Sequence, residues 1–565
     1  MEKFSNLPYS RPDFEALKSD FEKLIHQFEI ASTAEYQIEI IKKINDIRVD
    51  FSTAMNIAYV RNSINTVDEF YDAERAYFDE AYPLMQDLVV IYYKALNASK
   101  FKATLEATYG KQLFDLVEVS VRSFSPEVIA DLQEINALSS EYSKQVSLAK
   151  IEFDGKTLNL AGMDPYMQST DRAVRKNATL ATYGWWEKNA TMFDDIYDKM
   201  VKKRHAIAQK LGYENFVQLG YDNMGRTDYN AKDVAAFRAQ VLKHIVPFTV
   251  ELRKKQAERI GVDNLKIYDV SLSYTSGNPT PKGNPDWILA NGEKMYNEMS
   301  PETKIFFDMM VENELLDLVN KPNKQGGGYC TSFSKYKVPF IFSNFNGTSH
   351  DVDVLTHEAG HAFQNWESRN WEIEEYGWPT SEACEIHSMG MEFFAWPWME
   401  NFFKEDTAKY KFSHLSGALL FIPYGCAVDE FQHVVYENPT MTPAERNKAW
   451  REIDAKYRPY IDFDNIDYLE KGGFWKRQAH IYNSPFYYID YCLAQLCALQ
   501  FWKKSQEDRP TAWQDYLTLC QAGGSQSFLN LVKLAKLNNP FDENTIKPVV
   551  ESVKNWLSTI DDKKL

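Results

Sequence analysis

A chain of 565 residues exceeds the size at which one hydrophobic core stops growing, so the sequence predicts two packed lobes or a large helical body. Hydrophobic residues make up 44% of the chain and charged residues 25%, which excludes the disordered and fibrous classes. With 63 Lys and Arg against 80 Asp and Glu, the net charge is −17 and no basic block interrupts it, which excludes a nucleic-acid partner.

The N-terminal segment MEKFSNLPYSRPDFEALKSD has no apolar core of the kind that signal peptides carry. No later stretch reaches the roughly 20 apolar residues that span a bilayer. We therefore expect a soluble, cytoplasmic protein without a membrane partner. The six cysteines show no C-x-x-C spacing and no disulfide-scaffold density, so we expect reduced, structural thiols.

Long amphipathic helices are predicted over residues 12–255, where apolar residues recur every three or four positions. The fold class is therefore mainly α. We expect a helical N-terminal lobe over residues 1–205 and a catalytic lobe over residues 206–565. The many Tyr and Phe residues at core spacing are assigned to packing.

Two breaks interrupt this helical pattern. Pro, Gly, Ser and Asn cluster over residues 267–287, which predicts a long surface loop or a boundary. A second break has three glycines, residues 326–328, followed by the β-rich run 338–342 and the Asn346-Gly347 turn signal. This run is predicted to form the only clear sheet, and the glycines a hinge or a point of close backbone approach.

The segment SHDVDVLTHEAGHAFQNWESR predicts a helix that opens with the capping-type residues Ser349 and Asp351. His357 and His361 are four residues apart, so their imidazoles project from one side of successive turns and can reach one metal ion. Glu358 is rotated by about 100° around the helix and can face a water on that ion. The pattern predicts one zinc ion per chain.

Zinc lowers the pKa of bound water toward about 7 and polarises a carbonyl group. A neighbouring carboxylate can then take the water's proton and pass it to a leaving amine. This combination is what peptide hydrolysis needs, so Glu358 is the predicted general base.

A zinc peptidase needs a third protein ligand, and the segment PTSEACEIHSMGMEFFAW offers carboxylates for it. Five of its residues share one helical stripe, namely Glu382, Glu385, Met389, Glu392 and Trp396. The aromatic surroundings favour burial, which is costly for carboxylates without a cation. Spacing alone does not choose between Glu382 and Glu385, and Cys384 and His387 are further candidates by chemistry.

The segment RQAHIYNSPFYYIDYCLAQL is the best source of a donor for the oxyanion that hydrolysis creates. His480 precedes an Asn-Ser-Pro loop, and three tyrosines follow. Tyr488 and Tyr491 share a face if a helix begins near Pro485. Their hydroxyl groups could donate to an oxyanion.

The sequence HEAGHAF, residues 357–363, followed by E-I-H-S-M-G-M-E, residues 385–392, resembles the signature of the thimet oligopeptidase and oligoendopeptidase F family of zinc peptidases. The likeness is greatest to the bacterial Pz-peptidase-like members. It implies that Glu385 is the third zinc ligand and that Glu392 positions a ligand. Glu382 would then be a site-lining or solvated carboxylate.

The resemblance also implies roles for the C-terminal segment and for the strand. His480, Tyr488 and Tyr491 match residues that position substrate and stabilise the transition state. The edge of the strand before the metal helix would pair with an extended peptide. The implied substrate-binding residues are Gly327, Gly328, Tyr329 and Tyr487. The Asn-Ser-Pro loop departs from the Gly-Gly-Tyr of mammalian-type members.

The resemblance implies two lobes across a deep central channel, with a small sheet beside the zinc helix. The expected function is endopeptidic hydrolysis of short peptides, with proline- and glycine-rich ones favoured if the Pz-peptidase likeness holds. A zinc carboxypeptidase or dipeptidyl carboxypeptidase is one alternative, and an inactive peptide-binding helical scaffold is another. The sequence places none of the remaining histidines at the metal: His26, His205, His244, His350, His414 and His433.

Overall fold

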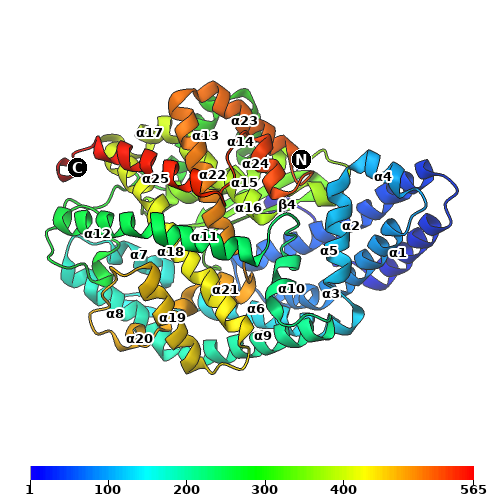
Figure 1. The fold of residues 1–565 in the computed structure, drawn as a ribbon, viewed down its shortest axis with the longest axis horizontal. Coiled ribbons are helices and arrows are strands. Elements are labelled where there is room, and N and C mark those ends of the chain that lie inside the picture. The colour runs from blue at the N-terminus through cyan, green and yellow to red at the C-terminus, as the bar shows by residue number, and fades with distance from the viewer. Residues whose placement is uncertain (1) are drawn as a thin grey trace.

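The computed structural model describes residues 2–565, and helices dominate it, as the periodicity predicted (Figure 1). The first five helices lie together at one end of the long axis as a projecting arm. They are α1 (Phe14–Glu29), α2 (Ala34–Ile64), α3 (Glu69–Asn97), α4 (Lys102–Tyr109) and α5 (Lys111–Arg122). The arm has its own apolar core, which also takes in Ile373 and Tyr376, residues that follow the predicted metal helix in the sequence. The arm is thus fastened to the region that carries the metal helix.

Helices continue after the arm, with one hairpin among them. The elements are α6 (Ile129–Ser147), β1 (Ile151–Phe153), β2 (Lys156–Leu158), α7 (Leu160–Met167), α8 (Arg172–Lys188), α9 (Ala190–Lys210), α10 (Phe216–Asn223), α11 (Ala231–His244) and α12 (Val246–Ile260). The prediction of unbroken helices here was wrong at the hairpin. Asp154 and Gly155, with φ of 52° and 70°, form the two-residue turn that an Asp-Gly pair favours.

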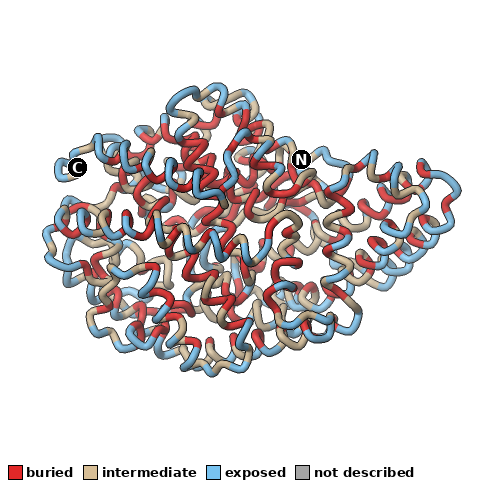
Figure 2. The backbone as a smooth tube through the Cα atoms, viewed as in Figure 1, coloured by how far each residue is buried: buried red, intermediate tan, exposed pale blue. Residues whose placement is uncertain are grey.

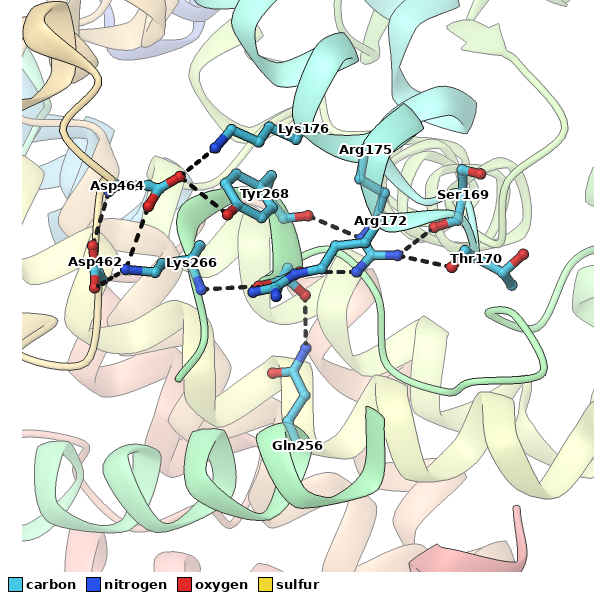
Figure 3. Close-up of polar contacts among 11 residues, drawn as sticks. Ser169, Thr170, Arg172, Arg175, Lys176, Gln256, Lys266, Tyr268, Asp462 and Asp464 are labelled. Carbon is cyan, nitrogen blue, oxygen red and sulfur yellow. Dashed lines mark hydrogen bonds and ion pairs between the residues drawn. The ribbon is translucent and has the colours of Figure 1, made fainter. Parts of the chain in front are cut away.

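An ion-pair network around the buried Asp269 ties distant segments of this region together (Figure 3). Asp269 is fully buried and accepts hydrogen bonds from Arg172 at 2.6 Å and Arg175 at 2.8 Å, both from α8. Close by, the ammonium group of Lys266 lies 2.7 Å from the carboxylate of Asp462. The acidic loop at residues 462–464 is therefore paired with lysines, which link it to α8 and to the segment before Asp269.

The remaining elements build the sheet and the catalytic helices. They are α13 (Pro285–Met299), α14 (Pro301–Glu312), β3 (Leu316–Val319), β4 (Tyr329–Phe333), β5 (Val338–Phe345), α15 (His350–Ser368), α16 (Ser381–Phe394), α17 (Met399–Phe403), α18 (Thr407–Glu437), α19 (Pro443–Tyr457), α20 (Asp467–Glu470), α21 (Ala479–Asn483), α22 (Tyr488–Glu507), α23 (Arg509–Ala522), α24 (Phe528–Leu534) and α25 (Glu543–Ser558). Figure 2 shows that buried residues concentrate where α15, α16 and α22 lie. The predicted loop at 267–287 is irregular from residue 270 to residue 284; it begins with a short 3-10 turn at Ile267–Asp269, and its last three residues already belong to α13.

The predicted strand is confirmed as β5, but the expectations about its sheet were wrong in two respects. A second, two-stranded sheet exists in β1 and β2, and β5 is the central strand of its own sheet, in the order β3-β5-β4. It pairs parallel with β3 and antiparallel with β4, so its backbone groups are already used. The open edge that could pair with a peptide belongs to β4.

Helix α15 begins directly after Ser349, as predicted, but its capping differs from the prediction, and α22 begins later than predicted. The Ser349 side chain makes no capping hydrogen bond to α15; instead, the Asp351 carboxylate accepts from the backbone N–H groups of Asn346 and Gly347 at 2.8 Å each. Asp351 thus closes the turn between β5 and the helix. The last long helix of the site, α22, begins at Tyr488 and not near Pro485, because Phe486 adopts a left-handed backbone conformation with φ of 66°.

Candidate metal centre and active site

Helices α15 and α16 bring together two imidazoles and one carboxylate. The ligand atoms of His357, His361 and Glu385 all lie within 4.8 Å of one another. The Glu385 Oε2 atom is 3.2 Å from His357 Nε2 and 3.3 Å from His361 Nε2. A tetrahedral zinc site with bonds of about 2.0 to 2.1 Å separates its donor atoms by about 3.3 Å. The donor set and its spacing therefore fit zinc.

Gly360, within the HEAGH sequence, allows these two helices to approach closely enough. A Cβ atom at this position would lie 2.6 Å from both the backbone oxygen of His387 and the Cα atom of Ser388. Any side chain here would therefore force α15 away from α16. The glycine sets the distance between the histidines and the carboxylate of Glu385.

The Glu385 carboxylate is 1% exposed, and both of its oxygens have defined partners. Oε2 accepts a hydrogen bond from the Ser388 hydroxyl at 2.8 Å, and Oε1 accepts one from the Tyr487 hydroxyl at 2.6 Å. Burial opposes ionisation, but the nearby His361 and His357 outweigh it and hold the pKa of Glu385 well below its usual range. The group is therefore an anionic oxygen donor.

Glu392 joins two histidines into one hydrogen-bonded chain. Its Oε1 lies 2.7 Å from His357 Nδ1 and its Oε2 lies 2.7 Å from His414 Nε2. The indole N–H of Trp396 donates to His414 Nδ1 at 3.1 Å, so His414 carries its proton on Nε2 and donates to Glu392. Burial opposes ionisation of Glu392, but these histidines outweigh it and lower the pKa of the carboxyl to about 2.

The sequence showed no pattern that places His414 near the metal region, whereas in the structure it hydrogen-bonds to Glu392 there. Its partner in the chain lies 22 residues earlier, and the contact depends on how α18 packs beside α16. The only sequence signal was an apolar, aromatic helix containing an isolated histidine. His350, another of these histidines, lines the cavity beside the centre.

Glu358 lies next to the three donor residues and is 6% exposed. Among the described residues, nothing hydrogen-bonds to its Oε2 atom, so one carboxylate oxygen is free to accept a proton. Burial raises the pKa of Glu358, against the lowering effect of His357 and His361. A Cβ atom at Gly328 would lie 3.2 Å from Glu358 Oε1, so this glycine brings the start of β4 close to the carboxylate.

A second hydrogen-bonded chain leads to Tyr491. The Tyr424 hydroxyl donates to Gln478 Oε1 at 2.9 Å, which directs the amide N–H of Gln478 to His480 Nδ1, also at 2.9 Å. The His480 Nε2–H group can then donate to the Tyr491 oxygen at 3.1 Å. Burial lowers the pKa of His480 to about 4, which keeps the ring neutral. The proton of the Tyr491 hydroxyl is left to donate into the cavity.

Glu382 is neither solvated nor site-lining, so that expectation was wrong. It is fully buried near Arg226, and burial raises the pKa of its carboxyl to about 7. Arg226 forms a fully buried ion pair with Asp490 at 2.7 Å.

Neither of the other chemical candidates, Cys384 and His387, joins the donor group. Cys384 donates to the backbone oxygen of Pro379. The His387 ring nitrogens have no partner among the described residues.

Three cavities run from the donor group toward the N-terminal arm. The first, of about 450 Å³, is lined by His357, Glu358, Tyr488 and Tyr491, among others. It shares Gly328 and His480 with a second cavity of about 590 Å³, which the open edge of β4 borders. The second shares Met55 and Tyr82 with a third cavity of about 580 Å³, which lies between the arm and residues of α6, α9 and α10.

Of the four predicted substrate-binding residues, three line a cavity and one does not. Gly327, Gly328 and Tyr329 line the second cavity. Tyr487 lines none of the three and instead lies against Glu385.

All six cysteines are free. No helix within residues 2–565 combines the length and apolar character needed to cross a membrane.

Comparisons with known proteins agree with one another. Residues 4–124 match the Peptidase M3 N-terminal domain, and residues 165–281 and 293–550 match Peptidase family M3. A solved structure titled Pz peptidase A with inhibitor 2 is 57% identical, with a TM-score of 0.99 over 99% of this chain and 100% of that one. A putative oligoendopeptidase F from Bacillus anthracis is 52% identical, with a TM-score of 0.94 over the full length of both chains.

More distant relatives have related names. An oligoendopeptidase F homolog of Borreliella burgdorferi is 24% identical over 398 residues, which is 67% of this chain and 65% of that one. The group B oligopeptidase PepB of Streptococcus agalactiae is also 24% identical, over 65% of this chain and 61% of its own length. The matched region thus covers less than two thirds of each of these two relatives.

Proposed function

The chain belongs to peptidase family M3, and from this premise we propose that it is a zinc-dependent endopeptidase that hydrolyses short peptides within its cavities. The single observation that supports this most is the arrangement of His357, His361 and Glu385 at zinc-donor spacing, with the buried carboxylate of Glu358 beside them. These three residues would hold one zinc ion. Zinc, when bound there, polarises the scissile carbonyl and lowers the pKa of water.

Glu358 is proposed as the general base. Its free oxygen takes a proton from the attacking water, and the same carboxyl then gives the proton to the leaving amine. Because burial raises the pKa of this carboxyl, it is a better proton acceptor than an exposed glutamate. Proton transfer of this kind typically contributes about 10²- to 10⁴-fold to the rate.

Tyr491 is proposed as the donor to the developing oxyanion, because His480 holds its oxygen and leaves its proton available. Tyr488 lines the same cavity and is proposed to position the substrate. Glu392 is proposed to orient His357 through the hydrogen bond to Nδ1. The open edge of β4 would pair with an extended peptide through backbone hydrogen bonds. Such pairing gives little selectivity for the side chains of the peptide.

An endopeptidase is favoured over a carboxypeptidase by the charges of the first cavity. Asp353, Glu358 and Glu392 line it, and its described lining includes no Lys or Arg that could bind a terminal carboxylate. The proposed substrates are oligopeptides because the cavities lie between the arm and the helices that follow it, and their volumes of about 580 and 590 Å³ suit short peptides. Preference for proline- and glycine-rich peptides, by analogy with the Pz peptidase, is part of the proposal.

The test is hydrolysis of a quenched fluorescent peptide blocked at both ends, assayed with the zinc-loaded and the chelator-treated protein. We expect internal cleavage that disappears on chelation and returns with zinc. Cleavage that requires a free C-terminal carboxylate would support the carboxypeptidase alternative instead. The absence of cleavage in a zinc-loaded protein would favour the inactive scaffold.

A further inference from the structure

Phe486 has an unusual combination of burial and backbone conformation. Its side chain is fully buried, and its φ of 66° lies in the left-handed region that non-glycine residues seldom adopt. It immediately precedes Tyr487, the residue whose hydroxyl contacts Glu385. Such a strained conformation persists only when the surroundings fix it, so the contacts of Phe486 show what holds it.

Two buried side chains bind the backbone of Phe486 from opposite sides. Its N–H group donates to Gln432 Oε1 of α18 at 2.9 Å, and its carbonyl oxygen accepts from Arg226 Nη2 at 2.6 Å. Arg226 also binds the Asp490 carboxylate in the first turn of α22. Gln432 and Arg226 are 0% and 4% exposed, so no solvent competes for these hydrogen bonds.

The ring of Phe486 is held just as closely by α10. A Cβ atom added at Gly220 would lie 2.5 Å from the Phe486 ring, so only glycine fits at this helical position. The ring also packs against Phe216, at a centroid distance of 6.3 Å, and against Tyr436, at 5.5 Å. The side chain and the backbone of Phe486 are therefore both fixed by α10, α18 and Arg226.

We propose that Phe486 is a fixed anchor that sets the position of Tyr487 against Glu385, and that Gln432, Arg226 and Gly220 are positioning residues for the reaction because they hold this anchor. The segment before α22 would then be a rigid support and not a mobile loop. The expected loss of activity in variants of the anchor rests on the proposed peptidase function. The expected rigidity of the segment does not. Positional errors of about 1 Å at a reacting centre can lower the rate by about a hundredfold.

Gly220→Ala is the sharpest perturbation. Alanine favours a helix more than glycine does, so the substitution suits the backbone of α10; the added Cβ atom would lie 2.5 Å from the Phe486 ring and 3.2 Å from the Phe216 ring, so the strain falls mainly on Phe486. Gly184→Ala is the matched control, because Gly184 is an exposed residue of α8 and a Cβ atom there would meet nothing within 4 Å. Gln432→Met, which removes the acceptor for the Phe486 N–H group, is the second variant if Gly220→Ala does not fold.

The structural readout is amide hydrogen exchange of residues 484–491 in the metal-free protein. We expect slow exchange of the Phe486 amide in the unmodified protein and in Gly184→Ala, and at least about tenfold faster exchange in Gly220→Ala or Gln432→Met. Rapid exchange of this segment in the unmodified protein would overturn the anchor, whether or not the protein is a peptidase.

The kinetic readout is a double-mutant cycle with Tyr487→Phe. We expect Gly220→Ala to lower kcat by about tenfold or more with one zinc retained, and by less than about twofold when Tyr487 is already Phe. Equal effects in both backgrounds would show that the anchor does not act through Tyr487. An unmodified protein that binds zinc but cleaves no peptide would refute the proposed function alone. The anchor would still be tested by hydrogen exchange, which does not require activity.

Discussion

Glu392→Gln tests the hydrogen-bonded chain that joins His357 to His414. The substitution keeps the size of the side chain and removes its charge. The carboxylate accepts two N–H groups at 2.7 Å, whereas an amide has one oxygen and can accept only on that side. Because Trp396 holds His414 Nδ1 as an acceptor, His414 presents its Nε2–H group to this side chain, and His357 would present its Nδ1–H group when its Nε2 atom binds zinc. The amide oxygen can accept only one of these two N–H groups, so the amide NH2 group faces the other donor.

The expected magnitude follows from the lost hydrogen bond. A hydrogen bond to a charged group contributes about 1.5 to 3 kcal/mol, which corresponds to about a 10- to 100-fold change in an equilibrium constant. The same range is found when partners of metal-binding histidines are replaced. We therefore expect the zinc Kd to rise by about 10- to 100-fold.

The assay is a competition titration of zinc against a chromophoric chelator of known affinity. Glu367→Gln is the matched control, since Glu367 lies on α15 but contacts the exposed Gln521 and not the metal centre. The control should bind zinc as the unmodified protein does. A zinc Kd within about twofold of the unmodified value in Glu392→Gln would refute the role given to this chain of residues.

Three further predictions concern the same region. Glu385→Ala should abolish stoichiometric zinc binding in elemental analysis, whereas Glu382→Ala should retain one zinc per chain. Arg226→Met should lower the free energy of unfolding in urea by about 3 to 5 kcal/mol, because it leaves a buried carboxylate without its cation. In a pH profile, kcat/KM should fall as the pH decreases through the raised pKa of Glu358, because the protonated carboxyl cannot act as a base. The pKa of His480, at about 4, keeps that ring neutral above pH 5. His480→Gln should therefore lower the maximum kcat/KM without changing the pH at which kcat/KM falls.

The local parts of the site could be predicted from the sequence because helical spacing determines them. Residues four apart on one helix share a side, so the placement of His357 and His361 follows from their numbers alone. Burial of the acidic stripe followed from its aromatic neighbours. The choice of Glu385 over Glu382 did not follow from spacing and depended on the family resemblance, because both carboxylates lie on one face of α16.

The contacts between distant segments could not be predicted, because they depend on how helices pack. His414 reaches Glu392 from α18, and Gln432 reaches Phe486 from the same helix. The position of β5 in the middle of its sheet depends on β3, a short strand with little periodicity of its own. The start of α22 depends on the left-handed Phe486, which tertiary contacts impose against its intrinsic preference.

The central claim is that a zinc ion held by three residues acts together with the Glu358 carboxylate. Glu358→Gln tests it most directly, because the amide fills the same space but cannot take a proton. The measurements are the zinc content and the rate of cleavage of a blocked fluorescent peptide by the same preparation. We predict about one zinc per chain with kcat reduced by at least about 100-fold. Full activity in the zinc-loaded variant would contradict the proposed mechanism.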